Sequence, residues 1–227
     1  MSVTGALFRI YRPIIIPFAV LLVAVELIAA KAVASVNDLS FSMWLVLGGN
    51  AAKYWLLVVG IILVAMQLRQ FVVNGVTRHE FIAAVGMFGL VLVVGWAVAV
   101  VLGHGIESVA LDAAGKRAAG YPTLTFGEAL SELGRQLPIS LAYLVSGATI
   151  AAGFYRWRPW LGLVVMVGGA VPAVVADGLL GFTEFGGLTH KVVPYPAALA
   201  LSLLATGLGA WGFHRLISDV AIRRAAA

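Results

Sequence analysis

Three ionisable residues, Glu26, Lys53 and Asp177, interrupt long apolar stretches of the sequence. Charged side chains are costly in hydrocarbon, so such residues pair with one another or line a path for protons, ions or polar molecules. Glu26 lies thirteen residues after Pro13, and Lys53 lies thirteen residues before Met66. In antiparallel helices that rise about 1.5 Å per residue, both groups lie about 20 Å from the same membrane boundary. We therefore expect an intramembrane ion pair between Glu26 and Lys53, which Asp177, at a similar or slightly more external level, is placed to join.

This polar group has two interpretations. In the functional one, it lines a polar substrate path or carries proton or ion coupling. In the structural one, it is an ion pair that holds neighbouring helices together while the Lys53 side chain extends toward the membrane surface.

The other reactive side chains do not form a catalytic or metal-binding pattern. The sequence has no Cys, which excludes disulfides, thiol nucleophiles and Cys-ligated metals. It contains neither the Gly-x-Ser-x-Gly nor the His-Glu-x-x-His pattern of hydrolases. The four histidines, His79, His104, His190 and His214, fall near the ends of apolar stretches, whereas haem needs imidazoles inside facing helices. We expect interfacial histidines, no enzyme activity, and no metal or cofactor in this chain.

The composition indicates that membrane helices position these residues. Hydrophobic residues make up 62% of the chain, charged residues make up 11%, and the mean hydropathy is +1.02. Soluble domains have about 25% charged residues. The net charge of +5 comes from Lys and Arg scattered at the ends of apolar stretches, which favours contact with lipid headgroups over nucleic acid. We expect an all-α membrane protein with a single transmembrane domain over residues 1–227.

Six apolar runs are long enough to cross a bilayer, which takes about 20 residues. They are expected at residues 13–34, 44–66, 81–102, 137–155, 160–182 and 196–217. The turn 156–159 reads Arg-Trp-Arg-Pro, and basic loops face the cytoplasm. We therefore expect both termini to be cytoplasmic. This orientation places Arg9, Arg12, Arg69, Arg78, Arg156, Arg158, Arg215, Arg223 and Arg224 inside, against Lys31, Lys53, Lys116, Arg117, Arg135 and Lys191 outside.

Two further helical segments are expected next to the spans. The residues before Arg12 can form a short amphipathic helix along the inner interface. Its lipid-facing side chains would be Leu7, Phe8, Ile10 and Tyr11. In the long external segment 103–136, Thr125 and Glu128 have the Thr-x-x-Glu spacing of a capping box, which predicts a helix leading into the fourth span.

The connection between the second and third spans has the most specific local pattern in the chain. Asn74-Gly75 is a turn signal, and Thr77 with Glu80 again has capping-box spacing. The residues before the turn present an apolar side that includes Phe71. The sequence therefore predicts a short helix, a turn and a new helix in this cytoplasmic connection.

The run Asn74-Gly75-Val76-Thr77-Arg78-His79-Glu80-Phe81 resembles the sequence that small six-span permease subunits of bacterial ABC-2-type transporters carry between spans two and three. Chain length, span number and the amphipathic start agree with this family. The resemblance implies that the segment before the turn is a coupling helix, which docks into a groove on a separate ATP-binding subunit. The implied coupling segment contains the contact residues Arg69, Gln70, Phe71 and Asn74, followed by Gly75, Thr77, Arg78 and Glu80. Without the resemblance, the same pattern is a helix-turn-helix that returns the chain to the bilayer.

The resemblance also implies a function and partners. It implies export of a lipid-like, peptide or drug-like compound across the bacterial cytoplasmic membrane. ATP and Mg²⁺ would be bound by the partner ATP-binding cassette subunit, because this chain has no Gly-x-x-x-x-Gly-Lys-Ser/Thr phosphate loop. Such a transporter has two membrane subunits, so we expect a two-fold dimer with a second copy or a related permease. Small residues suited to close helix contacts occur in the last two runs at Gly162, Gly168, Gly169, Ala205 and Gly209.

The position of the long external segment departs from that family, and a different transport function is also compatible with the sequence. The long external segment lies between the third and fourth spans, whereas the family places its re-entrant helices between the fifth and sixth. The alternative is a secondary carrier or accessory membrane protein, with proton or ion coupling through Glu26, Lys53 and Asp177.

Overall fold

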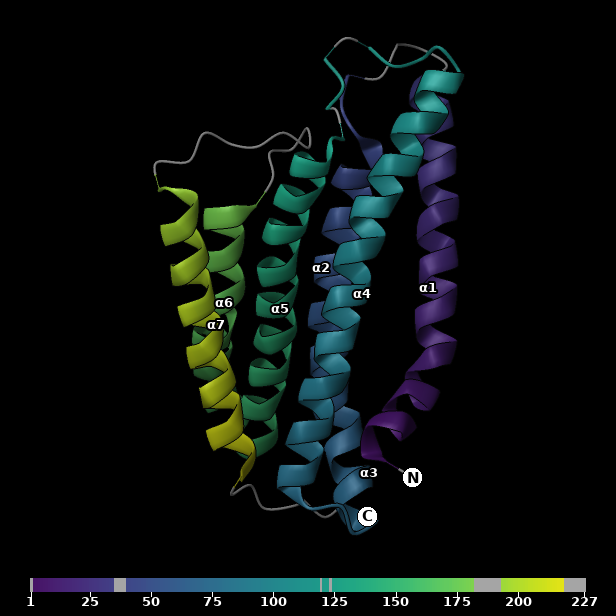
Figure 1. Cartoon of the computed structure of the whole chain (residues 1–227). Helices are drawn as coiled ribbons and strands as arrows, with labels where there is room; N and C mark the ends of the chain where they lie inside the picture. Colours follow the sequence, from purple (N-terminus) through teal and green to yellow (C-terminus); the bar gives the residue numbers. More distant parts are fainter. Residues whose placement is uncertain (1, 35–39, 119, 123, 182–192, 219–227) are drawn as a thin grey trace.

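Helices make up nearly all of the structure that the computed structural model describes, which covers residues 2–34, 40–118, 120–122, 124–181 and 193–218 (Figure 1). In chain order they are α1 (Val3–Ala34), α2 (Met43–Ile62), the π-helical turn η1 (Leu63–Gln67), α3 (Leu68–Val73), α4 (Arg78–Ala113), α5 (Phe126–Arg156), α6 (Pro159–Leu180) and α7 (Tyr195–Ser218). Six helical segments are long and apolar enough to cross a membrane, and α2, η1 and α3 together form one of them. The all-α class and the six helical segments of spanning length are thereby confirmed, and they support a multi-pass membrane protein.

The two ends of the bundle are named here by their place in Figure 1. The lower end contains the start of α1, the short helix α3, the start of α4 and the end of α7. The upper end contains the end of α1, the start of α2, the end of α4 and the start of α5. The described parts of the chain therefore enter and leave the bundle at the same end.

The helices at the upper end are longer than the expected spans. Helix α4 continues past Leu102 to Ala113, and α5 already begins at Phe126. The start of α5 is the predicted capping box, in which the Thr125 amide donates to the Glu128 carboxylate at 2.7 Å and the Thr125 hydroxyl accepts from the Glu128 amide. Much of the expected external segment is therefore helical, including the predicted helix that leads into the fourth span. The expected end of the fifth span at residue 182 lies outside the described residues.

Helix α1 differs from the expectation of a separate interfacial helix. It is continuous from Val3 to Ala34 and bends in its lower part, where Pro13 and Pro17 remove backbone hydrogen bonds (Figure 1). The expected lipid-facing side chains Leu7 and Tyr11 are fully buried. They lie four residues apart and so share one face of the helix, which packs on the core around Phe88 of α4.

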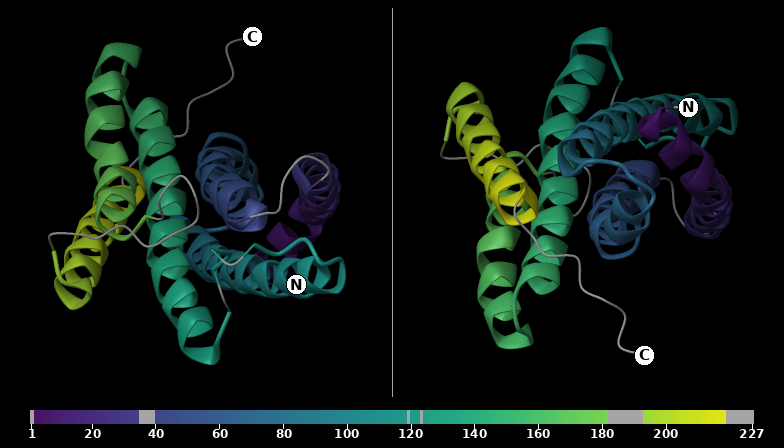
Figure 2. Two further views of the ribbon diagram at one scale, coloured as in Figure 1. Left: turned by 90° about the horizontal axis from the view of Figure 1, so that it is seen from above. Right: turned by 90° about the horizontal axis from the view of Figure 1, so that it is seen from below.

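Figure 2 shows α5 between two groups of helices, with α1, α2 and α4 on one side and α6 and α7 on the other. Helix α5 contacts α2, α4, α6 and α7, whereas α1 packs mainly against α2 and α4. Aromatic side chains join the middle of α1 to its neighbours. The Phe18 ring stacks on the Trp55 ring with centroids 5.1 Å apart, and it forms an edge-to-face contact with the Trp96 ring with centroids 5.4 Å apart. The opposite face of α1 exposes large apolar side chains such as Leu21 and Ile28, as a lipid-facing helix does.

The backbones of α2 and α5 come into direct contact. A Cβ atom added to Gly60 would lie 2.3 Å from the Leu144 carbonyl oxygen, and one added to Gly147 would lie 2.0 Å from the Leu57 carbonyl oxygen. Only glycine allows this approach, since both distances are far shorter than van der Waals contact. This crossing joins the two groups of helices.

Candidate functional site

The short helix α3 ends in a turn that requires glycine. Gly75 has a φ of 86°, the left-handed conformation that residues with a side chain rarely adopt. The Val76 amide donates to the Phe71 carbonyl at 3.0 Å, and the Gly75 amide donates to the Val72 carbonyl at 3.1 Å. These two bonds are those of a Schellman motif, so α3 is sharply terminated and the chain reverses toward α4.

Helix α4 then begins with the predicted capping box. The Thr77 hydroxyl accepts from the Glu80 amide at 3.2 Å, and the Thr77 amide donates to the Glu80 carboxylate at 2.9 Å. The predicted sequence of short helix, turn and new helix is therefore confirmed. Because these bonds use the Thr77 and Glu80 side chains, those two residues fix the geometry of the segment.

The coupling segment predicted from sequence divides into exposed and packed residues. Arg69, Gln70 and Asn74 are exposed. Phe71 is half-buried and packs on Phe81 of α4 with ring centroids 5.9 Å apart, and Arg78 is also half-buried. The lower end thus presents Arg69, Gln70 and Asn74, together with exposed Val73, on a helix whose other face is fixed to the bundle.

The intramembrane ion pair differs from the predicted one. The Lys53 ammonium lies 2.7 Å from the Asp177 carboxylate, which joins α2 to α6. Lys53 also lies 5.4 Å from the centre of the Tyr54 ring and 5.5 Å from that of Tyr143. The expected pair with Glu26 is wrong, because Lys53 projects from the side of α2 that faces α5 and α6 whereas Glu26 lies beside α4.

A small polar cavity of about 40 Å³ adjoins this ion pair. Its walls include Asn50, Lys53, Gln136 and Asp177. A cavity holds one water when about 10–15 Å³ is open to a water-sized sphere and polar partners surround it, and both conditions hold here. Three of the four groups carry amide or ammonium donors, so the site is suited to water or to a small polar group.

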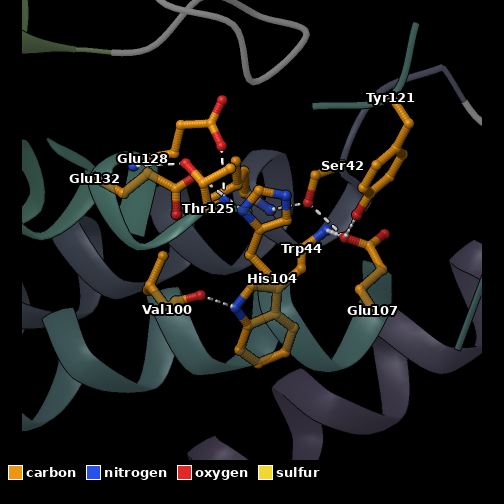
Figure 3. A network of polar contacts seen from close by, with 10 residues as sticks. Ser42, Trp44, Val100, His104, Glu107, Tyr121, Thr125, Glu128 and Glu132 are labelled. Atoms are coloured by element: carbon orange, nitrogen blue, oxygen red, sulfur yellow. Dashed lines mark hydrogen bonds and ion pairs between the residues drawn. The ribbon is translucent and has the colours of Figure 1, made fainter. Parts of the chain in front are cut away.

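A second polar network at the upper end joins α2, α4 and the segment after α4 (Figure 3). Its centre is Glu107 of α4, which accepts hydrogen bonds from the Ser42 hydroxyl, the Met43 amide, the Trp44 amide and the Tyr121 hydroxyl. The first amides of a helix have no partner within it and attract negative charge. Glu107 therefore caps α2 from a neighbouring helix. The sequence analysis missed this role, since nothing in the sequence links residue 107 to residues 42–44.

Tyr121 lies in the same network and outside the spans. Burial, together with the adjacent negative charge of Glu107, raises the pKa of the Tyr121 phenol well above its ordinary value. The phenol is therefore protonated at neutral pH and donates to Glu107 at 3.0 Å.

His104 lies deeper than expected. It is fully buried, and its Nδ1 atom lies 2.8 Å from the Glu132 carboxylate of α5. Helix α4 continues past His104 to Ala113, so this histidine lies within a helix and not at the end of one. At the lower end, His79 and His214 do approach each other, with ring centroids 5.9 Å apart. Among the described residues, no group of three or more His, Asp or Glu side chains is placed to hold a metal.

An apolar groove of about 730 Å³ lies along α5, α6 and α7. Small residues Gly168 and Ala205 line it, and the side chains of Arg156 and Arg215 lie at its lower end. Of the small residues noted in the sequence, Gly162, Gly169 and Gly209 pack within the chain, against Phe154, Ile150 and Pro172 respectively. A Cβ atom added to Gly168 would meet no atom within 4 Å, so this glycine does not pack closely within the chain.

Comparison of the chain with protein-family models, with curated proteins and with solved structures found no match.

Proposed function

We propose that this chain is the membrane permease subunit of an ATP-driven, ABC-2-type exporter in a bacterial cytoplasmic membrane, with α3 as its coupling helix. The observation that carries the proposal is the form of residues 68–80. A six-residue helix with an exposed polar face ends in a glycine turn and is followed at once by a capped spanning helix. Arg69, Gln70 and Asn74 are the side chains that a docked partner would contact.

The attachment of α3 to the bundle supports this role. Helix α3 continues from α2 through η1, and Phe71 contacts Phe81 at the start of α4. A force applied to α3 therefore acts on the second and third spans together. Closure of a partner subunit against α3 would be transmitted to the membrane helices in this way.

The proposal assigns ATP and Mg²⁺ to a separate ATP-binding cassette subunit, because the sequence has no phosphate loop. It places the lower end in the cytoplasm, and the arginines there, including Arg69, Arg78, Arg156 and Arg158, support that orientation. The substrate, a lipid-like, peptide or drug-like compound, would pass between two membrane subunits, which are two copies of this chain or this chain and a related permease.

The test is purification of the chain from its native membranes, with identification of the copurifying polypeptides and an ATPase assay on the complex. We expect a stoichiometric ATP-binding protein. Arg69→Glu should leave the chain inserted and lower the affinity of the complex by about tenfold or more, since an exposed contact residue is reversed in charge. Arg158→Glu is the matched control, because Arg158 is an exposed arginine at the same end on a different connection. Equal behaviour of the two variants contradicts the proposal.

A second candidate function, a secondary carrier or an accessory protein, is favoured by the Lys53–Asp177 pair beside a polar cavity. It predicts that the chain purifies alone. It also predicts that purified chain in vesicles moves solute in response to a proton or ion gradient, and that Lys53→Leu abolishes this movement.

A further inference from the structure

Glu26 has an unusual environment for a membrane carboxyl group. It is only 6% exposed, and neither of its oxygens receives a hydrogen bond from an N–H or O–H donor. None of the ion pairs formed among the described residues includes it. A buried carboxyl group that accepts no N–H or O–H hydrogen bond is costly, so a donor that binds from outside the chain would stabilise it.

Glu26 lines a cavity of about 200 Å³ between α1, α4 and the start of α2. The side chain of Glu107 also lines the cavity, from α4, and lies close to the Glu26 carboxyl group. The remaining walls are apolar and include Val23, Leu27 and Ile106, with the ring of Trp44 at one side. Leu27 and Ile106 are also exposed on the outer face of the helices, so the cavity is accessible from the lipid side.

The two carboxyl groups differ in their hydrogen bonds. Glu107 accepts from donors around the start of α2 and from Tyr121 (Figure 3), whereas Glu26 accepts from no N–H or O–H donor. Two adjacent carboxylates repel each other, and a cation placed between them removes this repulsion. The donor set does not suit a metal ion, since the described residues place no third His, Asp or Glu with these two.

We propose that this cavity binds a small amphipathic organic cation whose ammonium group donates to Glu26 and lies near Glu107, and whose apolar body contacts Val23, Leu27 and Ile106. The aromatic ring of Trp44 adds a surface that attracts cations. A dry apolar cavity of about 150 Å³ holds a benzene molecule, so a cavity of this size accommodates a ring with a short ammonium arm. This binding site does not depend on the proposed transport function, because it needs neither α3 nor a partner subunit.

The test uses two probes of nearly equal shape and different charge, 4-fluorobenzylammonium and 4-fluorobenzyl alcohol. Binding to the purified chain in lipid nanodiscs is followed by fluorine NMR, with empty nanodiscs to subtract partition into lipid. We expect saturable binding of the ammonium probe. Glu26→Gln should weaken this binding about tenfold or more, because a charge-assisted hydrogen bond is lost, and should leave alcohol binding unchanged. Asp112→Asn is the control, since Asp112 is an exposed carboxylate on α4 outside the cavity.

Two outcomes overturn the proposal. If the wild-type chain binds no ammonium probe saturably, the two carboxyl groups form only an internal pair. If Glu26→Gln weakens both probes equally, the charge of Glu26 does not select the ligand. A second variant covers the case in which Glu26→Gln does not insert: Ala30→Phe fills the cavity from the same face of α1 and should abolish binding while Glu26 is retained. Undiminished binding to Ala30→Phe would place the ligand elsewhere.

Discussion

Gly60 of α2 and Gly147 of α5 lie where the two helix backbones touch, so that a Cβ atom on either residue would overlap the other helix. The crossing is the main direct link between the α1–α2–α4 group and α5. It therefore fixes the rotation of α2 that directs Asn50 and Lys53 toward α5 and α6.

The first prediction concerns this crossing. Gly147→Ala should lower the free energy of unfolding by about 1–3 kcal/mol, because the added methyl group forces the helices apart. Gly86→Ala on α4 is the control, since Gly86 faces open space and alanine favours the helix there. The free energy of unfolding of both variants can be measured in mixed micelles. Equal free energies for Gly147→Ala and Gly86→Ala would contradict the close contact at Gly147.

A second prediction follows from the Lys53–Asp177 ion pair. Lys53→Leu should destabilise the protein by about 2 kcal/mol, less than the roughly 3–5 kcal/mol of a fully buried pair, because the Asp177 side chain is 35% exposed. The double variant Lys53→Leu with Asp177→Leu should recover much of this loss. A double-mutant cycle for Lys53 and Glu26 should show no coupling. Coupling of Lys53 to Glu26 instead of Asp177 would overturn the pairing.

The cap that Glu107 provides for α2 gives a third prediction. Glu107→Gln should cost about 1–2 kcal/mol in unfolding free energy, because the helix amides lose a charged acceptor. Hydrogen exchange should also become faster at the amides of Met43 and Trp44, which donate to Glu107. The control is Asp112→Asn, which removes an exposed carboxylate of the same helix. Slow exchange at both amides in Glu107→Gln would show that Glu107 is not their acceptor.

The fourth prediction is a pH dependence at Tyr121. Its pKa is raised in the folded protein, so the folded state holds the phenol proton more tightly than the unfolded state. Stability from this group is fully present below about pH 10, the pKa of an unfolded tyrosine, and falls as the pH rises above it. Unfolding measured across this alkaline range should show a shallower loss for Tyr121→Phe than for the wild type. An unchanged slope would show that Tyr121 titrates normally.

Local features of the fold could be predicted from the sequence because neighbouring residues determine them. The Thr77–Glu80 and Thr125–Glu128 capping boxes and the Gly75 turn each depend on residues within a few positions. The six spans follow from the length of the apolar runs alone. These features required no knowledge of how the helices are arranged.

The contacts between helices could not be predicted in this way. Both Glu26 and Asp177 lie at suitable depths to pair with Lys53, and the choice between them depends on the rotation of α2, which the Gly60–Gly147 contact sets. The burial of His104 depends on the extension of α4, which continues to Ala113 past Gly103 and Gly105, although glycine at such a position is a common signal for the end of a helix. The depth of a residue along its helix can be predicted from the sequence. The direction in which its side chain points around the helix axis depends on how the helices pack.

The π-helical turn η1 between α2 and α3 has one further consequence. A π-turn contains one more residue than an α-helical turn, and each residue of an α-helix advances the side-chain direction by about 100°. The residue added between 63 and 67 therefore sets the direction, around the helix axis, in which the side chains of Arg69 and Gln70 point away from the bundle. Deleting one residue there would keep α3 and its composition and yet turn its polar face toward a different neighbour.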